Sequence, residues 1–322
     1  MLSPLCELAE LAALADPLDV TAVREEFPAL QRTDHGRPLV HLDSAATSLT
    51  PRAVIEALVS YYETCPGNVG RGIHRLAQEA NRRFEDARET IASFVNADAR
   101  ELIFVRNATE AINLVASSLT GDVTVVHALS EHHSNMLPWR RATRAIAARI
   151  LADGQIDLDH FAAQVELHHP ALVACSHVTN AWGVLNPIPE IVEIARRVGA
   201  RVLLDASQSA PHRELDLRQL QCDYVCFSGH KMCGPTGIGV LCALGDAIDQ
   251  LVPLCVGGGS VESVQDDDVH WRAAPHRFEA GTPHIAGAIG LAAACDYLDS
   301  VGIQAIETHV AGLSTVARQR LP

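Results

Sequence analysis

Short apolar runs alternate with longer amphipathic segments through most of the chain. Runs of four or five mostly apolar residues, bounded by polar or glycine-containing turns, are typical of buried strands. They occur at residues 102–105, 123–126, 172–175, 201–204, 223–227 and 238–242, with a further short run at 39–43. Segments with helical spacing predict helices at 51–62, 76–94, 188–198 and 285–298, and from residues 109 and 303 onward. Strand, helix and strand in repetition predict an α/β fold, with a mostly parallel sheet flanked by helices on both faces.

This pattern divides the chain into three parts. Residues 1–35 are acidic and rich in leucine and alanine, and they predict an N-terminal helical arm whose second half is capped near Asp19. Residues 36–300 contain all the predicted strands and form the expected large domain. Residues 301–322 predict the start of one more helix.

Polar side chains follow the predicted strands at the points where those strands end. In open, mostly parallel sheets, ligands bind beyond the carboxyl ends of the strands, so these side chains are expected to share one site. They are Thr109, His132, Asn180, Asp205, Gln208 and Lys231.

Lys231 stands in the glycine- and proline-containing turn 228–237, directly after the predicted strand 223–227. Glycine and proline stop a helix from continuing through the turn, so the lysine is expected in a loop at a strand end. A lone lysine in such a loop is more often a solvated surface residue than a functional one. The residues at the ends of the other strands decide between a surface lysine and a functional one.

Two of those exits allow a structural or a functional interpretation. A hydroxyl at the start of a helix, such as that of Thr109, can hold an anion or can simply cap the helix. His132 and His133 are adjacent, and side chains of an extended backbone alternate in direction, so at most one of them is expected to face a common site. Zinc binding is the alternative for this pair, but no further ligand stands at a suitable spacing nearby.

Composition narrows the possible partners. A net charge of −14 repels phosphate backbones and anionic lipids, so we expect neither nucleic acid nor membrane as a partner. The N-terminus lacks the basic flank of a signal peptide, and no apolar run has the length of a membrane span, which predicts a cytoplasmic protein. The nine cysteines form no Cys-x-x-Cys pair, which favours reduced, mostly buried thiols and no metal site.

The polar side chains at the strand exits suit one cofactor. Pyridoxal phosphate needs a lysine for a Schiff base, a carboxylate beside its pyridinium nitrogen, a phosphate-binding cup and a group that covers its ring. Lys231, Asp205, Thr109 and His132 are the residue types required. The chain has no Gly-x-x-x-x-Gly-Lys sequence, so a nucleotide phosphate loop is not supported.

From about residue 20 onward, the chain also resembles a known family. It is similar to the cysteine desulfurase and selenocysteine lyase group of the class V aminotransferases, which are pyridoxal phosphate enzymes of fold type I. The motifs that carry the resemblance are Arg71-Gly72-Ile73-His74, Glu131-His132-His133, His177-Val178-Thr179-Asn180, Ser228-Gly229-His230-Lys231 with Gly234 to Gly239, and Arg277 to Pro283.

The resemblance implies a role for each matching residue. Lys231 would form the Schiff base, Asp205 would pair with the pyridinium nitrogen, and His132 would stack over the ring. Gln208 and Asn180 would contact the side of the cofactor's phenolic oxygen. The phosphate would be held by Thr109, Ser228 and His230, and by Thr282 across a dimer interface. Arg71 and His74 close a glycine-rich loop; they are either surface charges or point into the site, where we take them as substrate residues.

The chain also departs from the family pattern. In the family, a C-terminal small domain carries the cysteine that accepts sulfur and the arginine that binds the substrate carboxylate; we expect this small domain to be missing here. Cys233 stands where relatives often carry a large side chain, which favours a packing change over a relocated nucleophile. Gly70 and Trp182 also differ from common family residues, and both bear on substrate choice.

The implied activity is removal of sulfur or selenium from L-cysteine or L-selenocysteine to leave L-alanine, in a homodimer with a small amino-acid substrate and a sulfur-acceptor protein as partners. Two alternatives stay open. One is a pyridoxal phosphate-dependent lyase, epimerase or transaminase of a biosynthetic pathway. The other is a non-catalytic scaffold that pairs with a full-length relative.

Overall fold

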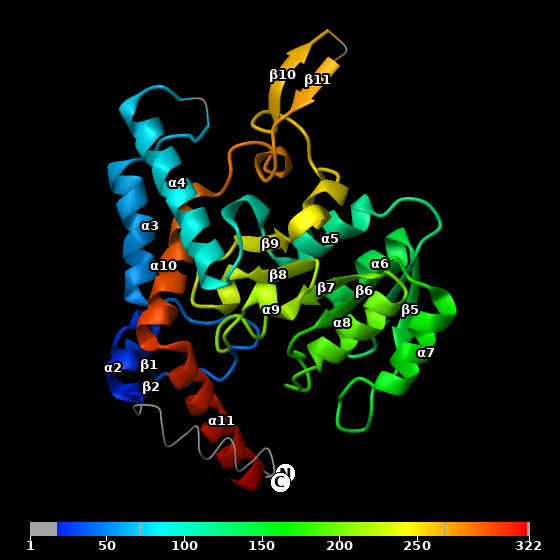
Figure 1. The fold of residues 1–322 in the computed structure, drawn as a ribbon. Coiled ribbons are helices and arrows are strands. Elements are labelled where there is room, and N and C mark those ends of the chain that lie inside the picture. Colours follow the sequence, from blue (N-terminus) through cyan, green and yellow to red (C-terminus); the bar gives the residue numbers. More distant parts are fainter. Residues whose placement is uncertain (1–17, 71, 267, 321–322) are drawn as a thin grey trace.

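The computed structural model describes residues 18–70, 72–266 and 268–320 (Figure 1). Its centre is a seven-stranded sheet in the order β3-β9-β8-β7-β6-β4-β5. Neighbouring strands are parallel from β5 to β8, whereas β9 is antiparallel to both β8 and β3. The strands are β3 (Leu102–Val105), β4 (Thr124–Ala128), β5 (Arg144–Ala148), β6 (Leu172–Ser176), β7 (Arg201–Asp205), β8 (Tyr224–Ser228) and β9 (Gly239–Ala243). The predicted α/β fold with a mostly parallel sheet is confirmed.

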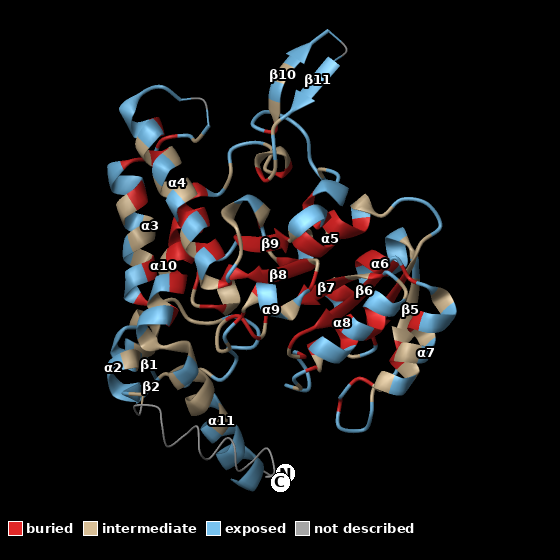
Figure 2. Ribbon diagram, viewed as in Figure 1, coloured by how far each residue is buried: buried red, intermediate tan, exposed pale blue. Residues whose placement is uncertain are grey.

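Helices cover both faces of this sheet, and the alternation of side chains along each strand explains why. In β7, Val202 and Leu204 point into one hydrophobic cluster and Leu203 points into the other. The first cluster is covered by α3 (Arg52–Thr64), α4 (Arg75–Phe94), α7 (Leu158–His168), α8 (Ile188–Arg197), α9 (Leu217–Leu220) and α10 (Ile285–Val301). The second is covered by α5 (Ala108–Ser118) and α6 (Leu137–Ala142). The strands are therefore mostly apolar along their length, and all except the edge strand β5 are largely buried (Figure 2).

Helix α10 is buried along most of its length and lies beside α3 and α4 (Figure 1). Close approach is possible because position 290 is glycine: a Cβ there would lie 2.8 Å from Cγ of Pro235 and 3.0 Å from the Leu58 side chain. Helix α11 (Ile303–Arg320) follows. Within the part of the chain that the structure describes, no single helix is long and apolar enough to cross a membrane; α10 and α11 reach that length and composition only as a pair bent by 74°.

The strand predicted at residues 39–43 was wrong. The segment is irregular, and its apolar side chains are in solvent: Val40 is 75% exposed and Leu42 is 92% exposed. A strand needs a partner along its length and a buried face, whereas among the described residues of this run only Leu39 bonds to the preceding segment, through its N–H to the carbonyl of Arg32 at 3.1 Å. A short antiparallel pair, β1 (Thr33–Asp34) with β2 (Arg37–Pro38), precedes it.

The structure describes the second half of the predicted N-terminal arm and a projecting hairpin. Residues 1–17 of the arm lie outside the described part; beyond them, α2 (Val20–Glu25) begins at the predicted cap, where Asp19 accepts the N–H groups of Thr21 and Ala22. The acidic stretch between residues 261 and 271 is a hairpin, β10 (Val261–Gln265) with β11 (Asp268–Trp271), which extends away from the body (Figure 1).

Candidate active site

The carboxyl ends of β4, β6, β7 and β8 meet at one edge of the sheet. In this register Ser176 is the cross-strand partner of Asp205, and Asp205 is the partner of Cys226. Electrostatic effects connect three of the side chains at these strand ends. Burial lowers the pKa of His132, the Lys231 ammonium lowers it further, and the Asp205 carboxylate opposes both effects. The His132 ring therefore lies within electrostatic reach of both Lys231 and Asp205.

Asp205 is the last residue of β7 and is only 7% exposed. Its Oδ1 accepts the N–H of Ser207 at 2.9 Å, and its carbonyl accepts the N–H of His177 at 2.9 Å. The carboxylate is thus held in a fixed position among buried neighbours, where its charge acts on surrounding groups with little screening by water.

Lys231 ends a short 3-10 turn, Gly229–Lys231, that follows β8 directly. Hydrogen bonds from Thr47 and Ser48, in the irregular segment before α3, hold this turn in place. The hydroxyls of Thr47 and Ser48 each donate to the carbonyl of His230 at 3.0 Å, and the N–H of Ser48 donates to the same oxygen at 2.9 Å. The lysine is half-buried.

The N-terminus of α5 lies against the end of β8. The N–H of Ala108 donates to Oγ of Ser228 at 2.9 Å. This contact depends on Gly239, because a Cβ there would lie only 2.8 Å from Cα of Asn107. The helix cap is Asn107, whose side chain accepts the N–H of Glu110, so the alternative interpretation of Thr109 as the cap was wrong. Backbone N–H groups at such a helix start, beside two hydroxyls, form a suitable environment for a phosphate.

Thr109 and His132 are joined through Ser134. The hydroxyls of Thr109 and Ser134 are 2.7 Å apart, and Nδ1 of His132 lies 3.0 Å from the same Ser134 oxygen. His133 lines a cavity of about 270 Å³ that Thr109 and Ser134 also line, together with Asn113, Leu137 and Arg141 among others. The Thr109–Ser134 pair therefore contacts His132 and also borders the cavity that His133 lines.

The remaining predicted cofactor residues vary in how firmly they are held. Gln208 donates through Nε2 to the carbonyl of Ala45 at 2.8 Å. Nδ1 of His230 lies 3.3 Å from Oγ1 of Thr47, and burial together with the Lys231 charge lowers the pKa of His230. Asn180 follows β6 and is exposed.

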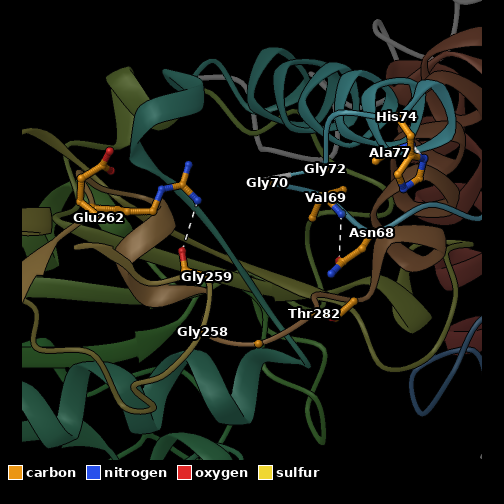
Figure 3. Close-up of a pocket in the computed structure, with 12 residues that line it drawn as sticks. Asn68, Val69, Gly70, Gly72, His74, Ala77, Gly258, Gly259, Glu262 and Thr282 are labelled. Carbon is orange, nitrogen blue, oxygen red and sulfur yellow. Dashed lines mark hydrogen bonds between the residues drawn. The ribbon is translucent and has the colours of Figure 1, made fainter. Parts of the chain in front are cut away.

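Thr282 and His74 lie elsewhere. They line a cleft of about 620 Å³ whose described lining does not include Lys231, Asp205 or His132. Figure 3 shows His74 and Asn68 on one side of this cleft and Glu262 on the other. Arg71, predicted beside His74, lies outside the described residues.

A buried ion pair fixes the segment that carries Thr282. Arg88 of α4, 2% exposed, donates to both carboxylate oxygens of Glu279, at 2.7 and 2.9 Å. It also donates to the carbonyl of Leu102, and Glu279 accepts the N–H of Phe104 at 2.8 Å. Strand β3 and the 277–283 motif are thereby joined. Sequence reasoning quoted this motif but gave Glu279 no role.

Glu131 was missed in the same way, although it stands in a quoted motif. Its buried carboxylate accepts three hydrogen bonds, from the backbone and hydroxyl of Ser176 and from the amide of Asn135. A carboxylate shortly after a buried strand is the signal that could have indicated such a network.

Comparison with known proteins gives consistent relatives. Residues 40–322 match the family described as aminotransferase class-V. The chain is 44% identical to a probable cysteine desulfurase of Streptomyces coelicolor, over 94% of this chain and 76% of the relative. An apo cysteine desulfurase from Thermococcus onnurineus NA1 has a TM-score of 0.86 at 36% identity, covering 95% of this chain and 76% of that one. An S-sulfonic acid form of a cysteine desulfurase from Escherichia coli has a TM-score of 0.82 at 34% identity, covering 94% and 78%.

Proposed function

The chain belongs to the aminotransferase class-V family, and we propose from this premise that it is a pyridoxal phosphate-dependent cysteine desulfurase-like enzyme. Such an enzyme takes the sulfur of L-cysteine, transfers it to a thiol and leaves L-alanine. The printed names of the similar proteins support this activity, and so does the residue set at the strand ends. One observation carries the proposal: Lys231 and Asp205 stand at the ends of the neighbouring strands β8 and β7, and the charges of both act on the His132 ring.

The side chains at this edge fit the cofactor. When bound, pyridoxal phosphate supplies an electron sink for negative charge at the substrate's α-carbon. Lys231 would hold the cofactor through Nζ and, once displaced by the substrate amine, would accept the α-proton at the same atom. Asp205 would keep the ring nitrogen protonated through a charge-assisted hydrogen bond, which is roughly twice as strong as a neutral one.

The start of α5 and its neighbours are proposed to hold the phosphate. Because Oγ of Ser228 already accepts the N–H of Ala108, its own O–H can donate to an anion. Thr109 and His230 would add further donors. Gln208 has a second N–H beyond the one that reaches Ala45, and this N–H and the Asn180 amide would contact the phenolic side of the ring.

We propose a homodimer in which Thr282 reaches the phosphate of the partner's site. The position of Thr282 in a cleft that is lined without Lys231 supports this role. His74 lines the same cleft and would, with Arg71, contribute to substrate binding.

The sulfur acceptor is proposed to be a cysteine other than Cys233. Burial raises the pKa of Cys233 to about 11, so its thiol is protonated at neutral pH and is a poor nucleophile. The thiol of a sulfur-acceptor protein would accept the sulfur instead, and in vitro a small dithiol can replace it.

The visible absorption spectrum of the purified chain tests this function. We expect added pyridoxal phosphate to give an absorption band that Lys231→Ala lacks, and L-cysteine with dithiothreitol to give equal amounts of alanine and sulfide. Pyruvate and ammonia in place of alanine would indicate a lyase instead. Absence of a Lys231-dependent band at excess cofactor would refute the enzyme proposal and leave a scaffold.

A further inference from the structure

Glu131 is a buried carboxyl beside the proposed site that has no role in the proposed chemistry. Its side chain accepts three hydrogen bonds. Oε1 accepts the N–H of Ser176 at 2.8 Å, while Oε2 accepts the Ser176 hydroxyl and the Asn135 amide, both at 2.6 Å. Burying a carboxyl costs several kcal/mol in general, so one that is kept at such a position needs a compensating function or structure.

The hydrogen bonds continue on both sides of this carboxyl. Oδ1 of Asn135 accepts the indole N–H of Trp139 at 3.1 Å, which fixes the orientation of the amide and aims its NH₂ at Glu131. Ser176 in turn is the cross-strand partner of Asp205, and its carbonyl accepts the Asn186 amide at 2.7 Å. An unbroken chain therefore runs from α6 to the strand end beside Asp205.

His132 follows Glu131 directly and begins the short turn His133–Asn135. Asn135, at the end of that turn, donates to the Glu131 carboxyl, which thereby closes the turn from the residue before His132 to its last residue. From this geometry we infer that Glu131 is a positioning residue, whose carboxylate fixes the turn that presents His132 to Lys231, Asp205 and the cofactor ring. The cofactor part of this inference rests on the proposed function; the anchoring of His132 does not.

The pKa of Glu131 reflects both its burial and its hydrogen-bond donors. Burial raises the pKa of Glu131 to about 7, with a smaller contribution from the Asp205 charge, and the bonds from Ser176 and Asn135 oppose the rise. These donors are what keep the group able to ionise near neutral pH.

Glu131→Gln breaks the chain at one defined bond. The oxygen of the introduced amide must stay at the Oε1 position to accept the Ser176 N–H, so its NH₂ replaces Oε2. The Ser176 hydroxyl, which donates to Oε2 in the native protein, can rotate and accept from this NH₂, but the Asn135 NH₂ faces it donor against donor. Asn135 cannot rotate to relieve this without losing Trp139. Adding Asn135→Asp restores the hydrogen bonds of residue 135, because the introduced carboxylate accepts from both the new amide at residue 131 and the indole N–H of Trp139. The double variant thus moves the negative charge from residue 131 to residue 135.

The ring pKa of His132 is the readout, measured by NMR on the full chain freed of cofactor, with its resonance assigned by its loss in His132→Asn. A loosened turn returns the ring to water, so Glu131→Gln should raise this pKa toward its ordinary value, and the double variant should lower it again. Simple removal of a negative charge would lower it instead. After reloading, we expect Glu131→Gln to weaken pyridoxal phosphate binding about tenfold and the double variant to recover within about twofold.

Glu193→Gln, the same change in an exposed pair on α8, should alter neither quantity. If Glu131→Gln does not fold, Ser176→Ala, which removes one donor, should give a smaller rise in the His132 pKa. An unchanged or lowered His132 pKa, or a double variant that behaves like the single one, overturns the inference. A wild-type chain without a Lys231-dependent band defeats the proposed function alone, since the His132 pKa comparison needs no cofactor.

Discussion

At the scale of single residues, histidines in this protein differ by what surrounds their rings. His177 follows β6 and is buried, with Nδ1 3.0 Å from Oγ of Ser209. Burial lowers its pKa to about 4, and the Arg213 charge acts in the same direction. His177 therefore stays neutral in the folded protein under conditions where an unfolded chain would bind a proton.

The first prediction follows from that difference. A folded-state pKa of about 4 lies below the ordinary value of 6.5, so the contribution of His177 to stability is complete above pH 6.5 and is lost as the pH falls toward 4. The loss is at most roughly 3 kcal/mol. His177→Asn should flatten this part of the pH profile, measured by urea unfolding from pH 7.5 to 4.5. His35→Asn, at an exposed site, should leave the profile as it is. Parallel profiles for His177→Asn and wild type would contradict the prediction.

At the scale of elements, two buried contacts fix helices α4 and α10 relative to the loops beside them. The Arg88–Glu279 pair connects α4 with the segment before α10, and the contact at Gly290 brings α10 against the loop after Lys231. Both are buried, so each can be tested by a small change that an exposed matched site would tolerate.

Arg88→Lys keeps the charge but loses the two parallel hydrogen bonds to Glu279 and cannot also reach Leu102. We expect a loss of about 2 kcal/mol in the free energy of unfolding, measured with urea. Arg197→Lys, in the exposed pair with Glu193, should cost much less, because solvent screens surface ion pairs. Equal losses for the two variants would show that the buried pair contributes no more than a surface one.

Gly290→Ala should destabilise the protein by about 1–3 kcal/mol, because the new methyl would overlap Pro235 and Leu58. Gly312→Ala makes the same change in α11, where nothing lies within 4 Å of the added carbon. There the higher helix propensity of alanine should stabilise by up to about 1 kcal/mol. Thermal unfolding should therefore move in opposite directions; a shift of the same sign would refute the packing argument.

The strands that could be predicted from the sequence are those covered by helices on both faces of the sheet. The strand runs at 172–175 and 201–204 are largely apolar because both sheet faces are covered. Strand β5 has an arginine and three alanines and lies at the sheet edge, so its sequence carries little strand signal. The run at 39–43 has the apolar pattern of a strand but lacks a partner strand in the described structure.

The candidate site was predictable to the extent that its residues stand at strand ends. Lys231, Asp205 and His132 follow from strand pattern and turn chemistry together with the family resemblance. Contacts between distant positions do not: Glu131 and Ser176 are 45 residues apart, and Arg88 and Glu279 are 191 apart. No local periodicity encodes such pairs, and only the folded chain reveals them.

At the scale of the whole molecule, the proposed dimer divides each site between two chains. Lys231→Ala and Thr282→Val would then impair different halves of it. In a heterodimer of the two variants, one site keeps both native residues, provided that Thr282 serves the partner's Lys231.

Random pairing of the two variants should restore about a quarter of wild-type alanine formation, since half of the dimers are mixed and each has one intact site. The measurement is activity after co-expression, compared with each variant alone and with dimer content by light scattering. No recovery in mixtures that contain mixed dimers would place Thr282 in the site of its own chain.

The pairing of β3 with β9 also has a consequence for biosynthesis. β3 lies at one edge of the sheet, and its partner begins at Gly239, more than 130 residues after β3 ends at Val105. On a ribosome that adds roughly 5–20 residues per second, this interval lasts on the order of ten seconds. Strands β4 to β8 can assemble as they emerge, whereas the apolar run Leu102–Val105 has to wait for its partner. A nascent chain of this protein therefore exposes the unpaired apolar strand β3 until β9 has been synthesised, and during that interval β3 is a segment that a ribosome-associated chaperone would need to cover.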